Sequence, residues 1–167
     1  MSDRTLRELV YGKGAHVNPV ACVEGISAEL AVRTVAGYPH SIWQLVEHMN
    51  YWMDYDLRMI AGENPTYPNH ASESWPEPPG SARAERWQAV TERFGQLLKR
   101  LTVLAESDSA VLMRIVVKAE PSNLQRQCMV HTALWEIVAH NSYHIGQVAL
   151  LRRQAGAWPP ERGGDTW

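Results

Sequence analysis

The stretch that decides the fold is residues 135–153, WEIVAHNSYHIGQVALLRR. Its apolar residues recur at steps of three and four positions, which is the spacing of one face of an α-helix. His140 and His144 are four positions apart, so in a helix they lie one above the other on the same face. They also align with Ile137 and Val148, and we therefore expect both imidazoles to point toward the core.

Four other segments have helical spacing or helix start signals. Asn18 followed by Pro19 is typical of a helix start, because asparagine caps the first turn and proline fits its first position. Ser41 can cap the next helix in the same way. The predicted helices, in chain order, are a short one over residues 3–11, then 19–35, 41–62, 81–106, and a last helix that begins between 122 and 132 and ends near 156.

Residues 62–80 cannot form a helix, because they contain five prolines, at positions 65, 68, 76, 78 and 79. A loop of this length is functional or packed, and Trp75 is predicted to hold it against the body of the protein. Residues 107–118 fit either a short helix or an extended piece. Together these elements predict an all-α fold, an up-and-down-like four-helix bundle with a long proline-rich loop, as a single domain over residues 1–167.

Composition and charge exclude several classes of partner. The net charge is −2 and no basic stripe is present, so nucleic acid is not an expected partner. The sequence contains no signal peptide and no apolar run of membrane-spanning length, so we expect a cytoplasmic protein that does not enter a membrane. Cys22 and Cys128 are accordingly expected to be reduced and buried.

Two histidines alone cannot complete a metal site, so a third ligand is needed. His131 lies nine positions before His140, which is about half a turn out of phase in a helix. His48 lies on a predicted helix at the edge of its apolar face. If the two helices pack side by side, His48, His140 and His144 converge in the interior. The remaining histidines fall in predicted loops: His16, His40 and His70.

Three imidazoles that leave a fourth position open are a known catalytic zinc pattern, whereas structural zinc sites are usually closed by four protein ligands. The alternative is that these are hydrogen-bonded core histidines, since a pair four positions apart also occurs by chance. Glu136 lies four positions before His140 and therefore on the ligand face. It is predicted to act as a general base or as an acceptor that orients an imidazole, the alternative being an ordinary exposed glutamate.

The segments His48-Met-Asn-Tyr-Trp52 and His140-Asn-Ser-Tyr-His144-Ile-Gly-Gln147 resemble the DinB/YfiT-like superfamily of four-helix bundles. The resemblance extends over essentially the whole chain, including the proline-rich loop and the ending LLRRQAGAWPP. It implies that His48, His140 and His144 bind a divalent metal, commonly zinc or nickel. It also favours a homodimer, which agrees with the surplus of apolar and aromatic residues in the loop and in the tail ending at Trp167.

Characterised members of this superfamily include enzymes that use low-molecular-weight thiols such as bacillithiol, mycothiol or glutathione, and some hydrolases. The resemblance therefore implies a metal-dependent enzyme that acts on a small-molecule substrate, as a thiol-dependent S-transferase in detoxification or stress response. Two alternatives remain open. One is a metal-dependent hydrolase, and the other is a non-catalytic stress or binding protein in which the metal only stabilises the fold.

Overall fold

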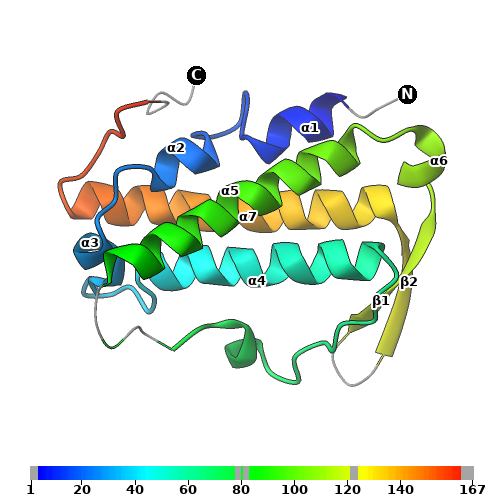
Figure 1. Ribbon diagram of the computed structural model, residues 1–167, viewed down its shortest axis with the longest axis horizontal. Coiled ribbons are helices and arrows are strands. Elements are labelled where there is room, and N and C mark those ends of the chain that lie inside the picture. The colour runs from blue at the N-terminus through cyan, green and yellow to red at the C-terminus, as the bar shows by residue number, and fades with distance from the viewer. Residues whose placement is uncertain (1–3, 78–79, 81–82, 121–123, 163–167) are drawn as a thin grey trace.

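The computed structural model of the chain describes residues 4–77, 80, 83–120 and 124–162. The described part is mostly helical and includes one small antiparallel sheet (Figure 1). Its elements, in chain order, are α1 (Arg4–Val10), α2 (Pro19–Val23), α3 (Ala28–Val32), α4 (Ile42–Ile60), the 3-10 turn η1 (Ala71–Ser74), α5 (Ala84–Ala105), α6 (Ser109–Leu112), β1 (Ile115–Glu120), β2 (Leu124–Met129) and α7 (Val130–Gln154).

The three long helices α4, α5 and α7 confirm the predicted helices 41–62 and 81–106 and the predicted last helix. At the start of α4, the Ser41 side chain accepts a hydrogen bond from the Gln44 backbone N–H, and the Gln44 side chain accepts one from the Ser41 backbone. This reciprocal cap satisfies two backbone donors that a helix start leaves unpaired. The predicted short first helix is also present, as α1.

The predicted helix over residues 19–35 is wrong, because α2 and α3 are separate short helices. Asn18 does cap α2, where its side-chain oxygen accepts hydrogen bonds from two backbone N–H groups. The helix then ends before Gly25, which has a φ of +70°. Glycine adopts this left-handed conformation without the steric cost that other residues incur, so the chain turns there. Ser27 caps the new helix α3.

The directions of the long helices also differ from those in an up-and-down bundle, because α4 and α5 run parallel (Figure 1). The Trp43 and Trp87 rings, near the two helix starts, are 5.3 Å apart. Further along both helices, Asp54 forms an ion pair with Arg93, about three turns after Trp43 on α4 and about two turns after Trp87 on α5. Helix α7 runs antiparallel to both. In the described part of the chain, α1 and α2 pack against α5 and α7, and no single helix takes the predicted fourth place.

The small sheet corrects the all-α prediction. Strands β1 and β2 form an antiparallel pair in which Ile115 lies opposite Met129 and Val116 opposite Cys128. Val116 and Cys128 are buried while Ile115 is exposed, as expected for a hairpin with one face on the helices. The segment 107–118, which fitted either structure, contains α6 and then most of β1.

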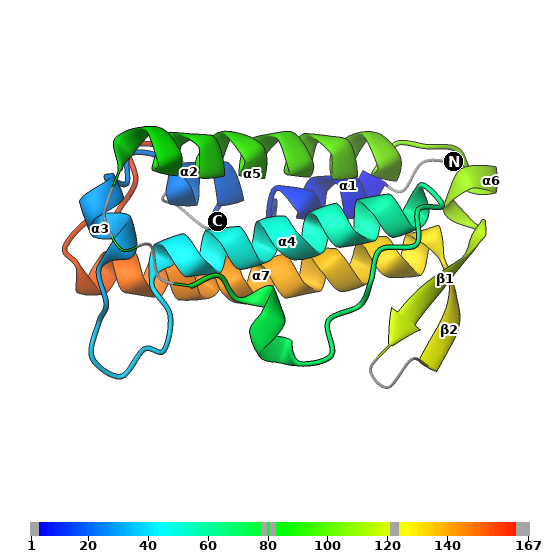
Figure 2. The ribbon, with the colours of Figure 1, turned by 60° about the horizontal axis from the view of Figure 1, so that its bottom comes forward.

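The proline-rich loop returns along α4 to the start of α5, which is why these two helices are parallel. Tyr67 lies beside Trp52, with 5.5 Å between ring centroids, and further along the loop Trp75 packs on His48, which confirms its predicted contact with the body. Figure 2 shows η1 and its flanking loop in front of α4 and α7. The predicted contact of Trp167 lies outside the described residues. No helix in the described ranges is long and apolar enough to cross a membrane.

Arg152 anchors the short helices to the end of α7, and its loss is predicted to destabilise the protein. It is 4% exposed, and its guanidinium donates to the carbonyls of Cys22, Glu24 and Ala157. An Arg152→Leu variant leaves these acceptors unpaired, and we expect it to lose roughly 2–4 kcal/mol of unfolding free energy.

Urea unfolding measures this loss. The matched control is Arg153→Leu, because Arg153 is exposed and stacks on the Trp158 ring. We expect the control to lose no more than about 1 kcal/mol. Equal losses in the two variants would contradict the anchoring role of Arg152.

Candidate metal centre

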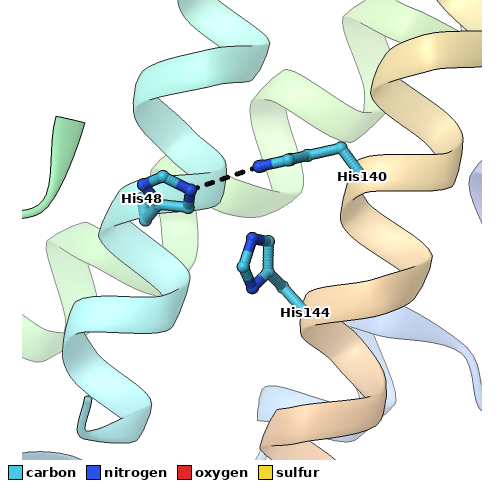
Figure 3. Close-up of side chains that lie close together, drawn as sticks. All are labelled: His48, His140 and His144. Carbon is cyan, nitrogen blue, oxygen red and sulfur yellow. Dashed lines mark hydrogen bonds between the residues drawn. The ribbon is translucent and has the colours of Figure 1, made fainter. Parts of the chain in front are cut away.

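Three predicted ligands meet where α4 packs on α7. His48 projects from α4, and His140 and His144 project from α7 toward it (Figure 3). The Nε2 atoms of His48 and His140 are 3.2 Å apart, and one nitrogen from each of the three rings lies within 4.8 Å of the others. Within the described residues this is the only group of three or more His, Cys, Asp or Glu side chains with such spacing.

The second nitrogen of each ring is bound to a protein acceptor. His48 Nδ1 lies 2.9 Å from the backbone carbonyl of Ser74, and His144 Nδ1 lies 2.7 Å from the side-chain oxygen of Gln147. A carbonyl oxygen only accepts hydrogen bonds, so both rings carry their proton on Nδ1. Their Nε2 lone pairs therefore remain available to a cation.

His140 differs because its Nε2 faces the Nε2 lone pair of His48. In the absence of a cation, His140 must carry its proton on Nε2 in order to donate across the 3.2 Å contact. With a cation present, that proton can move to Nδ1, where the side-chain oxygen of Asn141 lies 3.4 Å away. Each of the three histidines thus has an acceptor for the tautomer that metal binding requires.

The spacing of the His48 and His140 nitrogens fits a single small divalent ion. Two nitrogens that bind one tetrahedral zinc at 2.0–2.1 Å lie about 3.3 Å apart, and the observed separation of the His48 and His140 nitrogens is 3.2 Å. Imidazole ligands suit zinc and nickel alike. The donor set and its spacing are therefore compatible with a divalent metal.

Burial keeps the imidazoles neutral at neutral pH. His48 and His144 are each 5% exposed, and His140 is half-buried. Burial lowers the pKa of His48 to about 4, against a smaller opposing effect of the Ser74 carbonyl. Burial and the neighbouring His144 and His48 lower the pKa of His140 to about 4 as well. Neutral imidazole is the form that binds metal, so these shifts favour the ion.

The three histidines line a cavity of about 540 Å³, which is large enough for a small molecule. Its wall includes the aromatic side chains of Trp52, Tyr67, Trp75 and Tyr143. Tyr51 lines a neighbouring cavity of about 530 Å³ instead.

Glu136 lies on the same cavity wall, but its carboxylate is paired with two basic side chains. Its two oxygens lie 2.9 Å from Lys118 Nζ and 2.6 Å from a nitrogen of Arg126. Burial alone would raise the pKa of Glu136, but the hydrogen bonds from Lys118 and Arg126 outweigh burial and lower it. A role of Glu136 as a general base, or as an acceptor that orients an imidazole, remains a prediction.

One acidic residue of the site, Asp56, was not predicted from the sequence. Asp56, eight positions after His48, is 2% exposed and lines the same cavity. Its Oδ1 lies 3.4 Å from Lys118 Nζ, an ion pair without the alignment of a hydrogen bond. Burial raises the pKa of Asp56 to about 6, against the lowering effect of Lys118. The eight-residue spacing from His48 is the signal that could have identified Asp56.

We predict that the purified protein contains one divalent metal ion per chain and that His144→Ala, His140→Ala and His48→Ala each lose it, because two imidazoles do not complete the site. Metal analysis of tag-free protein measures this content. His131→Ala is the matched control, since His131 lies on α7 and contacts Trp135 rather than the three ligands. Unchanged metal content in the ligand variants would contradict the assignment.

The metal-free protein is predicted to lose stability as the pH falls from about 6.5 to about 4. The pKa of His140 falls from 6.5 to about 4 on folding. In this interval the unfolded chain therefore binds more protons than the folded one, and acid favours unfolding. Melting temperatures should fall less steeply with pH in a His140→Leu variant. The raised pKa of Asp56 has the opposite effect on stability, but Asp56 is present in both the wild-type and the His140→Leu protein. An identical pH dependence of the melting temperature in the two proteins would therefore contradict the neutral state of His140 in the folded protein.

The sequence profile of the DinB superfamily matches residues 18–148 of the chain, a range that contains His48, Glu136, His140 and His144. No curated protein and no solved structure matches the chain. The profile covers more than half of the chain and includes every ligand of the candidate metal centre. The chain therefore belongs to the DinB superfamily.

Proposed function

We propose that this protein is a metal-dependent enzyme, a thiol-dependent S-transferase that joins a low-molecular-weight thiol to a small electrophilic molecule. The proposed metal is zinc or nickel, held by His48, His140 and His144. The observation that supports catalysis over a purely structural metal is the position of the three imidazoles on the wall of a cavity of about 540 Å³. A structural ion is usually enclosed by four protein ligands.

A divalent ion bound there would supply Lewis acidity, which would lower the pKa of a thiol or of water bound to it. The protein's own residues provide the rest of the site. Ser74 and Gln147 hold the histidine tautomers that leave Nε2 unprotonated. Trp52 and Tyr67 form an apolar wall against which the body of a substrate can pack.

Two carboxylates in the cavity are proposed to accept the proton of the thiol. Glu136 is held ionised by Lys118 and Arg126, which makes it a fixed acceptor at neutral pH. Asp56 has a pKa raised to about 6 by burial, which is closer to the value that suits a general base. Both line the cavity that contains the three histidines.

A second candidate is a metal-dependent hydrolase, in which water replaces the thiol. Asp56 would serve this reaction equally well, because a buried carboxylate with a pKa of about 6 can take a proton from water near neutral pH. The two candidates differ in whether product formation requires a thiol.

We predict that chelated protein stays helical and unfolds cooperatively at a lower temperature, while thiol transfer disappears. The large buried core of α4, α5 and α7 does not depend on the three histidines, so the fold should survive loss of the ion. Circular dichroism before and after chelation measures the helical signal, and monochlorobimane with a panel of thiols measures transfer.

Restoring zinc or nickel should restore transfer in the wild-type protein but not in His140→Ala, and His131→Ala should behave as wild type. If the helical signal collapses together with the metal, the ion is structural and the enzyme proposal fails. If ester or amide substrates are cleaved in the absence of any thiol, the hydrolase takes its place.

A further inference from the structure

One segment of the proline-rich loop is docked directly on a metal ligand. We define the Trp75 strap as residues 71–76, which comprise η1, Trp75 and Pro76. The strap has its own internal bonds, from the Ser74 hydroxyl to the Ala71 carbonyl at 2.7 Å and from the Trp75 backbone N–H to the Ser72 carbonyl. It is therefore a short ordered unit in a loop whose other described residues lack regular structure.

Three contacts attach the Trp75 strap to α4. The Ser74 carbonyl accepts the Nδ1 proton of His48 at 2.9 Å. The Gln44 side chain donates to the Pro76 carbonyl at 3.0 Å. The Trp75 ring is stacked on the His48 ring, with centroids 3.8 Å apart and planes 4° from parallel.

The second face of the Trp75 indole is also covered. His40 stacks on it with centroids 3.6 Å apart and planes 7° from parallel. The indole thus lies between His40 and the ligand His48, and its edge meets His144 with centroids 5.6 Å apart. A ring held on both faces has little freedom to rotate, so it restricts the plane of the His48 ring beneath it.

These contacts restrict His48 in two independent ways. The Ser74 carbonyl determines which nitrogen carries the proton, and the stacked Trp75 ring determines the plane of the imidazole. Together they direct an unprotonated Nε2 toward the nitrogens of His140 and His144. An ion bound to Nε2 would in turn keep the proton on Nδ1 and so preserve the hydrogen bond to the Ser74 carbonyl.

The Trp75 strap also separates two cavities. Ser74 and Trp75 line both the cavity of the three histidines and the neighbouring cavity of about 530 Å³. The neighbouring cavity has polar walls that include Glu47, Asp54 and Arg93. If the strap left His48, the two cavities would join and His48 would lose both of its restraints.

We propose that the Trp75 strap is a positioning element of the metal centre, such that docking of the strap on His48 and binding of the ion stabilise each other. The inference rests on the proposed metal binding by His48, His140 and His144. Coupling of this kind is reciprocal, so the factor by which the docked strap raises metal affinity equals the factor by which the ion favours docking.

The effect of the docked strap on metal binding is tested by zinc affinity, measured by competition with a chelating dye. Loss of a group that orients a ligand typically weakens metal binding by about 10-fold or more, and we expect this for Trp75→Ala. Trp75→Phe keeps a ring to stack on His48 and should stay within about threefold of wild type. Trp135→Ala removes an indole that contacts His131 instead, and it should leave zinc affinity unchanged.

The effect of the ion on docking of the strap is tested by amide hydrogen exchange in residues 66–76, with and without zinc. Zinc should slow exchange in the wild-type segment, because an undocked strap is the open state and the ion favours the docked one. The same addition should have no effect in His140→Ala. His40→Ala uncovers one face of the Trp75 ring, and we expect its zinc affinity to lie between those of the wild type and Trp75→Ala. This variant serves as the second test if Trp75→Ala does not fold.

The outcomes separate the two claims. If Trp75→Ala and His40→Ala both bind zinc as tightly as wild type while only their metal-free melting temperatures fall, the Trp75 strap is merely structural and the inference is overturned. If the wild-type protein itself does not bind zinc or nickel, the proposed function fails instead. Weaker zinc binding in Trp75→Ala, recovery in Trp75→Phe and zinc-dependent slowing of exchange together establish the coupling.

Discussion

The packing of α4 against α7 is the constraint on which the site depends. It brings together side chains that are 92 positions apart, His48 and His140, with their nitrogens 3.2 Å from each other. Neutral imidazoles in such a place need partners, because a buried polar nitrogen without one costs free energy. The protein supplies an acceptor for one nitrogen of each ring and turns the others toward a common point. This arrangement is compatible with a bound divalent cation.

The parallel course of α4 and α5 gives the proline-rich loop its importance. In an up-and-down bundle a short turn would join these helices, whereas here the chain must return along the whole of α4 before α5 begins (Figure 1). That return places Ser74 and Trp75 on His48 and makes the loop a wall of the cavity. The prolines keep the loop out of a helix, so its backbone carbonyls are free to bind side chains of α4.

The β-hairpin brings cations to a cavity that the helices supply with carboxylates. Lys118 of β1 lies between Asp56 of α4 and Glu136 of α7, and Arg126 of β2 contacts the same glutamate. Burial would lower the pKa of Lys118, but the two carboxylates outweigh burial and raise it, so it stays charged. Without the hairpin, both carboxylates would lack a nearby cation, and the cavity would have a different charge.

The sequence by itself determined the elements with a strong local signal: the long helices, the Asn18 and Ser41 caps, the proline-rich loop and the four-residue spacing of His140 and His144. These follow from contacts within a few positions of the chain. Only the tertiary structure decided the pairing of β1 with β2, the parallel order of α4 and α5, and the partners of Glu136. Those features depend on contacts between residues that are distant in sequence. The pairing of two strands, the path of a long loop and the partner of a charged side chain are set by the elements packed against them, so the local periodicity of the sequence does not predict them.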